Sequence, residues 1–409
     1  MFSSLRTSVT LLLGVALFGC QPAIPDRSDW SGTLSLENGK SVPFRFTLDL
    51  SGHQPSAVFY NGDEASPVPE IHRTGDSLTF LFSEYQSAMS GVWNGREWQG
   101  QYARFRKDTT FNAFVARPIG APATQSASAI PAVALAGTYR VFLSTMHGTD
   151  SSMIATFGFH ADSVNGTLIA ADGDYGLLTG TQHADHAVLT RFTGWQAFLL
   201  ELDRNGTEWN GQLSGRNGPA QAIRLEPRAP EGASPVTERA TAPKYKQQPF
   251  RFHGITPEGE LVRSTDERFR GKAVLVDIMG TWCHNCMDAA PLLEQLSREF
   301  GPRGLIVVGL AFELKEDTAL ARRNLRFYAQ RYGLTFPLLF CGSMNSPAVD
   351  DILRSQLENF YAYPTTLFLD PRGRVHAVHI GFAGPGTGDA YQRLVRQYYD
   401  EIGQILPRR

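Results

Sequence analysis

The chain has 409 residues, of which 42% are apolar, and its formal net charge is −2. This length predicts about two to three globular domains, and the near-neutral charge argues against nucleic acid or another polyanion as a partner. Four cysteines are too few for a scaffold held together by disulfides.

Residues 1–19 have the pattern of a secretion signal. Arg6 supplies the positive charge near the start, and an apolar run over residues 11–18 follows. The end of this run resembles a lipoprotein signal site, so we expect Cys20 to be lipidated and residues 20–28 to form a tether. The alternative is ordinary signal cleavage, with Cys20 incidental. By the same resemblance, Gln21 points to an outer-membrane lipoprotein on the periplasmic side of the bacterial envelope.

Residues 29–118 and 135–228 consist of short alternating runs without a helical period. Turn dipeptides that favour tight hairpins separate these runs; they include Asn38-Gly39, Asn61-Gly62, Asn94-Gly95, Asn165-Gly166, Asp172-Gly173, Asn205-Gly206 and Asn217-Gly218. The two segments also look like repeats, because Trp98 near the end of the first matches Trp209 in the second. We expect two meander-like antiparallel β-domains with these tryptophans in their cores; one larger β-domain is the alternative.

Two segments rich in proline and alanine, residues 119–134 and 229–246, are predicted linkers. From residue 247 to 409 strand and helix patterns alternate, which predicts a partly parallel sheet with helices on both faces. The expected elements are a hairpin over 250–262, strands 273–279, 305–312, 336–340, 366–369 and 375–380, and helices 283–300, 317–332, 347–357 and 389–406.

Two cysteines stand three positions apart at the start of helix 283–300. Cys283 would lie at the helix N-terminus, where free N–H groups and the helix dipole stabilise a thiolate. Cys286 lies one turn further and can close a disulfide with Cys283. Half of a zinc site is the alternative, but Cys20 and Cys341 offer no second pair at ligand spacing. We therefore expect neither a metal site nor another cofactor.

The order of these residues carries a family resemblance. Trp282 and the two cysteines follow a strand that contains Asp277, and Tyr363-Pro364 comes later in the chain. This arrangement resembles the thioredoxin superfamily and, within it, the TlpA/ResA group of extracytoplasmic thiol–disulfide oxidoreductases. The resemblance covers about residues 247–409 and nothing before them, and it implies an α/β thioredoxin fold there. Together with the β-rich segments that precede it, this predicts a multidomain protein with an all-β N-terminal part.

The resemblance also implies roles for these residues. Cys283 is the attacking thiolate, Cys286 resolves the mixed disulfide, and Asp277 takes the proton from Cys286. Trp282 shields the disulfide, and Pro364 is the cis-proline that places neighbouring backbone beside the sulfurs.

Two more residues lie between the cysteines. We expect His284 and Asn285 to tune the redox properties of the pair, because a neighbouring imidazolium stabilises a thiolate. A solvent-facing helix position is the alternative for His284. Glu313, at the end of its strand, could also face the site. We expect Cys341, in an apolar strand, to be a buried, unreactive thiol.

The leading hypothesis is an enzyme that reduces protein disulfides. The resemblance implies cytochrome c or copper-site maturation clients and an upstream membrane electron donor. A peroxiredoxin-like enzyme is a second hypothesis, but Val276 and Gly280 occupy positions where that family has Pro and Thr. A third is a copper metallochaperone that uses the cysteines with His376 or His379, and a fourth is a binding module in the β-rich half.

Overall fold

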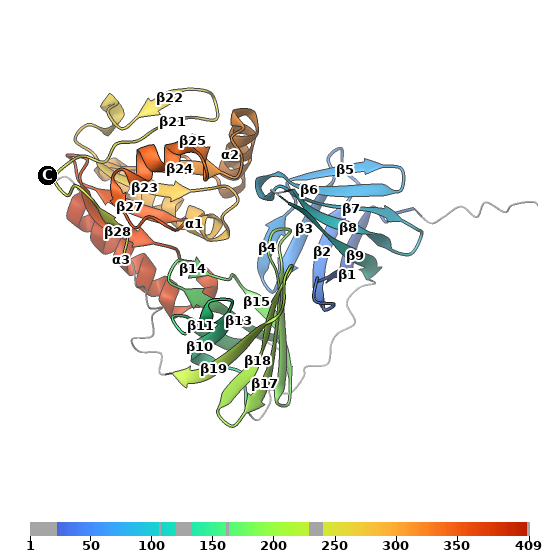
Figure 1. Cartoon of the computed structure of the whole chain (residues 1–409). Helices are drawn as coiled ribbons and strands as arrows, with labels where there is room; N and C mark the ends of the chain where they lie inside the picture. Colours follow the sequence, from blue (N-terminus) through green and yellow to red (C-terminus); the bar gives the residue numbers. More distant parts are fainter. Residues whose placement is uncertain (1–22, 106–107, 120–132, 161–162, 229–239, 407–409) are drawn as a thin grey trace, which may run out of the picture.

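The computed structural model describes residues 23–105, 108–119, 133–160, 163–228 and 240–406. It has three parts: a β-sheet at the N-terminus, a second β-sheet, and an α/β part at the C-terminus (Figure 1). The predicted signal, Cys20, and much of both predicted linkers lie outside the described residues. The exact domain boundaries stay predictions.

The first sheet is antiparallel and has the strand order β4-β3-β2-β1-β9-β8-β7-β6-β5. Its strands are β1 (Arg27–Ser35), β2 (Ser41–Asp49), β3 (Ser56–Asn61), β4 (Glu64–Pro67), β5 (Glu70–Thr74), β6 (Ser77–Phe82), β7 (Ser87–Trp93), β8 (Trp98–Phe105) and β9 (Thr109–Ile119). Alternate residues of β2 are buried, as the period of two requires. They pack with Trp30 and Trp98 in an aromatic core.

The second sheet closes into a barrel, because β10 pairs with both β12 and β19. Its strands are β10 (Gly137–Thr145), β11 (Gly148–Asp150), β12 (Ile154–His160), β13 (Ser163–Ala170), β14 (Gly173–Asp174), β15 (Leu178–His183), β16 (His186–Phe192), β17 (Ala197–Asn205), β18 (Glu208–Gly215) and β19 (Gln221–Arg228). Trp209 is buried in the barrel core. The expected pair of antiparallel β meanders is therefore confirmed.

The C-terminal part has a thioredoxin fold, with the sheet order β22-β21-β25-β24-β23-β27-β28. The strands of this sheet are β21 (His253–Ile255), β22 (Leu261–Arg263), β23 (Ala273–Met279), β24 (Leu305–Glu313), β25 (Leu338–Ser343), β27 (Thr365–Leu369) and β28 (Val375–Ile380). Two short strands, β20 (Ala242–Pro243) and β26 (Leu357–Glu358), pair with each other outside this sheet. Strands β23, β24 and β25 are parallel, whereas β27 and β28 pair antiparallel, with β28 at the edge of the sheet. The predicted α/β class is confirmed.

The helices are α1 (His284–Phe300), α2 (Thr318–Tyr332) and α3 (Asp389–Ile405). All three contribute buried residues to one hydrophobic cluster, whereas alternate residues of β23 face a second cluster. The helix predicted over 347–357 is wrong in extent. It is a π-helical turn, Val349–Arg354, because residues 357–358 extend to pair with β20.

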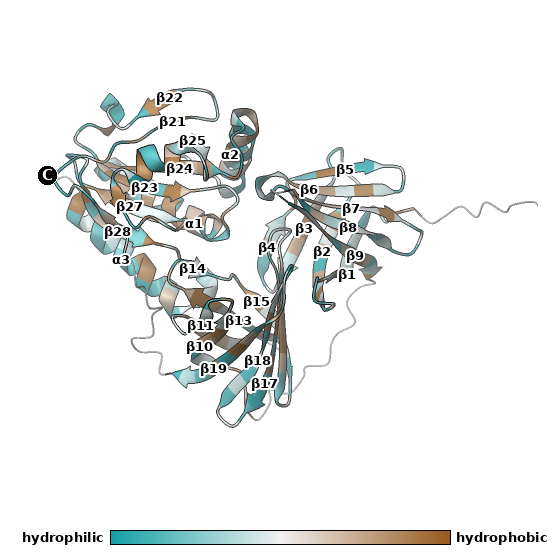
Figure 2. Cartoon of the chain, viewed as in Figure 1, coloured by the Kyte–Doolittle hydropathy of each residue, from teal (hydrophilic) through white to brown (hydrophobic). Residues whose placement is uncertain are grey.

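Apolar residues concentrate on the central strands of the thioredoxin fold and inside the barrel (Figure 2). Within the described part of the chain, no helix combines the length and the apolar character needed to cross a membrane.

Candidate redox site

Cys283 and Cys286 form a disulfide at the start of α1, with their Cα atoms 5.2 Å apart. Cys283 is the N-cap residue, and the backbone N–H of Cys286 donates to its Sγ at 3.2 Å. This bond satisfies one of the free N–H groups at the helix terminus. The same donor can stabilise a thiolate on Cys283 after reduction.

Two elements of the fold border the disulfide. The Tyr363–Pro364 peptide bond is cis, and the Tyr363 carbonyl oxygen lies 3.4 Å from Cys283 Sγ. Trp282 is half-buried; its indole N–H donates to the Phe312 carbonyl oxygen at 2.9 Å, and its ring packs edge-on against Tyr363. The structure therefore brings Trp282 and Pro364 to the cysteines.

Asp277 lies in the middle of β23 and is 3% exposed. Thr366 hydrogen-bonds its carboxyl group and in turn accepts from the Tyr398 hydroxyl at 2.8 Å. The other carboxyl oxygen, Oδ1, has no hydrogen-bond partner among the described residues. Burial raises the pKa of Asp277 to about 7, so this carboxyl group can exchange a proton near neutral pH.

A second buried carboxyl group supports the turn before the cysteines. Glu313 accepts from the backbone N–H of Thr281 at 3.0 Å and from its hydroxyl at 2.7 Å. Burial raises the pKa of Glu313 to about 7, against these hydrogen bonds. The expectation that Glu313 faces the site agrees with this contact.

Both residues between the cysteines contact the barrel instead of solvent. His284 has a side chain that is 10% exposed, and its ring nitrogens lie 3.0 and 3.2 Å from Arg191 Nη2 on β16. The side-chain amide of Asn285 forms two hydrogen bonds with the backbone of Asp174. Its N–H group donates to the Asp174 carbonyl oxygen, and its oxygen accepts from the Asp174 N–H. A solvent-facing position for His284 is therefore wrong.

Arg191 connects all three parts of the molecule. Its guanidinium group is fully buried and forms a bidentate pair with Glu64 on β4 of the first sheet. Burial acts to lower the pKa of Arg191, but the carboxylates of Glu64, Asp288 and Asp174 together outweigh burial and raise it. Burial and the Arg191 charge act to lower the pKa of His284, but Asp288, one turn along α1, and Glu64 together outweigh them, and the pKa lies above its ordinary value.

Asp174, His284 and Asp288 place their potential ligand atoms within 4.8 Å of one another. The Arg191 guanidinium is adjacent, and this cation would repel a metal ion. Asp174 instead accepts from the Gly384 N–H at 2.6 Å, and burial raises its pKa to about 6. The arrangement fits an ion-pair network better than a metal site.

The remaining candidates lie elsewhere. Cys341 is a free, half-buried cysteine on β25, and burial raises the pKa of its thiol strongly. His376 contacts Glu401, and His379 packs against Phe368 and Tyr398. These contacts give no support to a copper site that combines either histidine with the cysteines.

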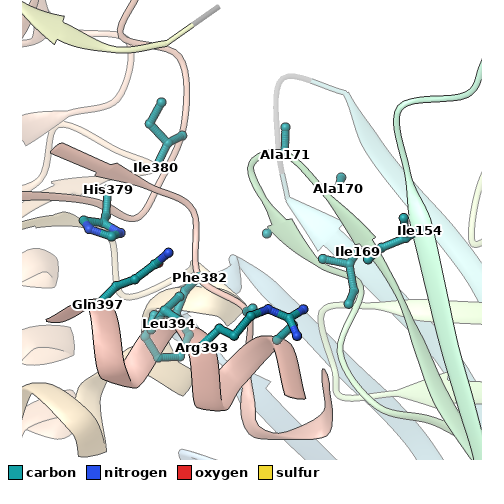
Figure 3. A pocket seen from close by; sticks show the side chains of 13 residues that line it. Ile154, Ile169, Ala170, Ala171, His379, Ile380, Phe382, Arg393, Leu394 and Gln397 are labelled. Carbon is teal, nitrogen blue, oxygen red and sulfur yellow. The ribbon is translucent and has the colours of Figure 1, made fainter. Parts of the chain in front are cut away.

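A groove remains open where the barrel meets the thioredoxin fold (Figure 3). It encloses about 220 Å³ between β12 and β13 on one side and β28 and α3 on the other. Ile154, Ile169 and Phe382 give it apolar walls, and Arg393 extends into it. Gly173, which also lines this groove, lies directly against Asn285.

Comparisons with known proteins agree with this geometry. The model of the AhpC/TSA family matches residues 240–378. The thioredoxin-like protein YneN of Bacillus subtilis is 32% identical over 135 residues, which are 33% of this chain and 71% of YneN. The chain belongs to the thioredoxin-like family. A second relative, the thiol–disulfide oxidoreductase ResA of Geobacillus thermodenitrificans, is 31% identical over 148 residues, which are 36% of this chain and 70% of ResA.

A solved structure resembles this thioredoxin-like protein more distantly. It is a thioredoxin-family thiol:disulfide interchange protein from Chlorobium tepidum, 23% identical, with a TM-score of 0.27. The match covers 39% of this chain and 99% of the other. The family assignment and the ResA match identify the protein as an enzyme, a thiol–disulfide oxidoreductase.

Sequence reasoning missed the barrel residues at the site. One signal was available: Ala187, Leu189 and Arg191 occupy alternate, buried positions of β16, so an arginine falls where the pattern requires an apolar residue. Nothing in the sequence near Glu64 or Asp174 indicated that either residue meets α1.

We predict that Gly173→Ala loosens the barrel from the disulfide. Gly173 has φ +139°, and an added Cβ would lie 1.7 Å from an atom of the Asn285 side-chain amide. We expect roughly 1–3 kcal/mol lower stability and faster alkylation of Cys283 by iodoacetamide in the reduced protein. Gly148→Ala is the control, since Gly148 has φ +119° and open space around it. Equal alkylation rates in both variants would show that this contact does not cover Cys283.

Proposed function

We propose that the protein is an exported, lipid-anchored reductase of protein disulfides that uses Cys283 and Cys286 as its redox pair. One observation carries the proposal: the pair forms a disulfide at the N-terminus of α1 in a thioredoxin fold, with Cys283 as the cap. Thiolate character at this position is what thiol–disulfide exchange requires.

The reaction follows from the order of the two cysteines. In the reduced enzyme, the Cys283 thiolate attacks a client disulfide, forms a mixed disulfide and releases one client thiolate. Cys286 then attacks Cys283 Sγ, which releases the second client thiolate and restores the Cys283–Cys286 disulfide. An electron donor must reduce this disulfide again. We propose that Asp277 takes the proton of Cys286 in the second step, while Trp282 and the backbone beside Pro364 position the client.

Further parts of the proposal rest on the family relationship and on the signal-like pattern of residues 1–19. The clients would be exported proteins with cysteine pairs, such as those of cytochrome c or copper-site maturation, and the donor would be a membrane protein. The enzyme would lie on the periplasmic side of the outer membrane. The net charge of −2 supports partners other than nucleic acid.

Wild-type protein tests this proposal directly. We expect it to reduce insulin with a dithiol as donor, and we expect the reduction potential of the cysteine pair to stay the same when copper is added. Hydrogen peroxide consumed faster than insulin would favour a peroxiredoxin-like enzyme. A potential that shifts strongly with copper would favour metal delivery. Either result would contradict the proposal.

We predict that anchoring depends on Cys20, because the end of residues 1–19 resembles a lipoprotein signal. One acyl chain binds membranes only marginally, whereas several chains hold a protein firmly. Fractionation of cells should place wild type in the membrane and Cys20→Ser in the soluble fraction. Wild type found wholly in the soluble periplasm would refute the anchor.

A further inference from the structure

The β-rich half of the chain holds the dipeptide between the two cysteines, and this contact suggests a role for that half. We propose that it supplies part of the redox site: the charge of Arg191, held beside His284 by Glu64, sets the reduction potential of the cysteine pair. The inference rests on the proposed function of Cys283 and Cys286.

Arg191 is fixed by neighbours on every side. Its guanidinium group donates to Glu64, to the Leu177 carbonyl oxygen at 2.9 Å, and to Gln196 at 2.8 Å. Gly176 makes room for it, since a Cβ there would lie 2.3 Å from the guanidinium carbon. A side chain with so many partners holds its charge in one position, which is next to the ring of His284.

Burial of the Arg191 charge costs desolvation free energy, and the stability of the fold alone does not explain why the protein has this charge. Arg191 occupies an inward position of β16, and Glu64 must be desolvated together with it. A buried ion pair of this kind is often no more stabilising than apolar residues of the same volume. An apolar residue at position 191 would be enough to fill this inward position of the barrel. The charge is therefore better explained by what it does to the neighbouring redox motif.

Arg191 contacts the ring of His284, and His284 directly follows Cys283, the cysteine that becomes a thiolate on reduction. A positive charge there stabilises the thiolate and makes the pair a stronger oxidant. Glu64 opposes this effect, because it partly neutralises Arg191. Glu64 of the first sheet and Arg191 of the barrel thus act on the potential with opposite signs.

Equilibration with glutathione measures the effect: one protein disulfide and two glutathione thiols exchange for one protein dithiol and one glutathione disulfide. We expect Arg191→Met to lower this equilibrium constant about tenfold, which makes the potential about 30 mV more negative. His284 could take up a proton and offset the lost charge. In the His284→Asn background, where this is impossible, the fall should be at least as large.

Three further variants separate charge from general disruption. Glu64→Gln leaves Arg191 without its counter-charge, so the equilibrium constant should rise severalfold. Arg191→Lys keeps a cation and should restore at least half of the loss in Arg191→Met. Arg216→Met is the matched control: Arg216 is a buried arginine between the two β-sheets that donates to Tyr102. This control should change the constant less than twofold.

Three results would overturn the proposal. Arg191→Met could leave the equilibrium constant unchanged, Arg191→Lys could lower it as much as Arg191→Met does, or Arg216→Met could lower it equally. Should Arg191→Met fail to fold, Glu64→Gln still decides, since a fall or no change in that variant contradicts the proposed sign. Failure of the proposed function would look different: wild-type Cys283 and Cys286 would then show no reversible disulfide with glutathione.

Discussion

Cys283→Ser should abolish disulfide reduction. A serine hydroxyl is not ionised near neutral pH, so the N-terminus of α1 has no thiolate to stabilise and client disulfides are not attacked. Insulin reduction with a dithiol donor should fall to the rate of the donor alone. Activity that survives this substitution would refute the assignment of Cys283 as the attacking cysteine.

Cys286→Ser should give a different defect, because the first attack remains possible. The mixed disulfide between Cys283 and the client then persists, and mass spectrometry should find it as a covalent adduct. Cys341→Ala is the matched control: its thiol lies on β25, where burial raises its pKa and keeps it protonated. This control should keep wild-type activity and form no adduct.

The sequence was most informative where function depends on neighbours along the chain. Cys283 and Cys286 are three apart, and Asp277 is on the strand that leads into them, so strand, turn and helix patterns placed them together. Turn dipeptides also indicated the β meanders, since hairpins are local. Closure of the barrel by β10 and β19 was harder, because a strand pattern does not specify its distant partner.

The contacts across the three parts could not be predicted for the same reason. Arg191 meets His284, and Asp174 meets Gly384, over long separations in sequence. A strand pattern shows that Arg191 faces inward on β16, but it does not show which residue of another part Arg191 or Asp174 contacts. The choice between a solvent-facing and a tuning role for His284 therefore could not be made before the barrel was placed against α1.

Asp277→Asn should slow the second step of the reaction and leave the first unchanged. Asp277 is buried with one oxygen lacking a partner among the described residues, and burial raises its pKa to about 7. A group with this pKa can take the Cys286 proton near neutral pH. Tyr328 donates to the Cys286 carbonyl oxygen, and burial, with a smaller contribution from the Asp277 charge, raises the pKa of the Tyr328 hydroxyl.

We expect release of the mixed disulfide to slow by about 10²–10⁴-fold, the usual effect of losing a general base. In wild type this rate should rise with pH through about 7 as Asp277 loses its proton, and in Asp277→Asn that rise should be absent. Stopped-flow measurement of both steps across pH gives the two rates. If both keep wild-type values and pH dependence, Asp277 is structural only.

The same substitution should stabilise the protein at alkaline pH. The folded pKa of Asp277, about 7, lies above its ordinary value of 3.8, so wild type loses stability as pH rises between these values. Asp277→Asn avoids this loss. The gain in the free energy of unfolding is absent at pH values below the ordinary pKa. It reaches at most roughly 4 kcal/mol at pH values above the folded pKa. Urea unfolding at both ends of this range measures the difference.

Glu84→Gln is the matched control for Asp277→Asn. Glu84 lies in the first sheet's part of the chain, is 5% exposed, and has a pKa that burial raises to about 7. It should also gain stability as pH rises, but less than Asp277→Asn because its ordinary pKa is 4.5 instead of 3.8, and release of the mixed disulfide should not change. A slower release in Glu84→Gln would mean that buried charge in general, and not proton transfer by Asp277, controls the second step.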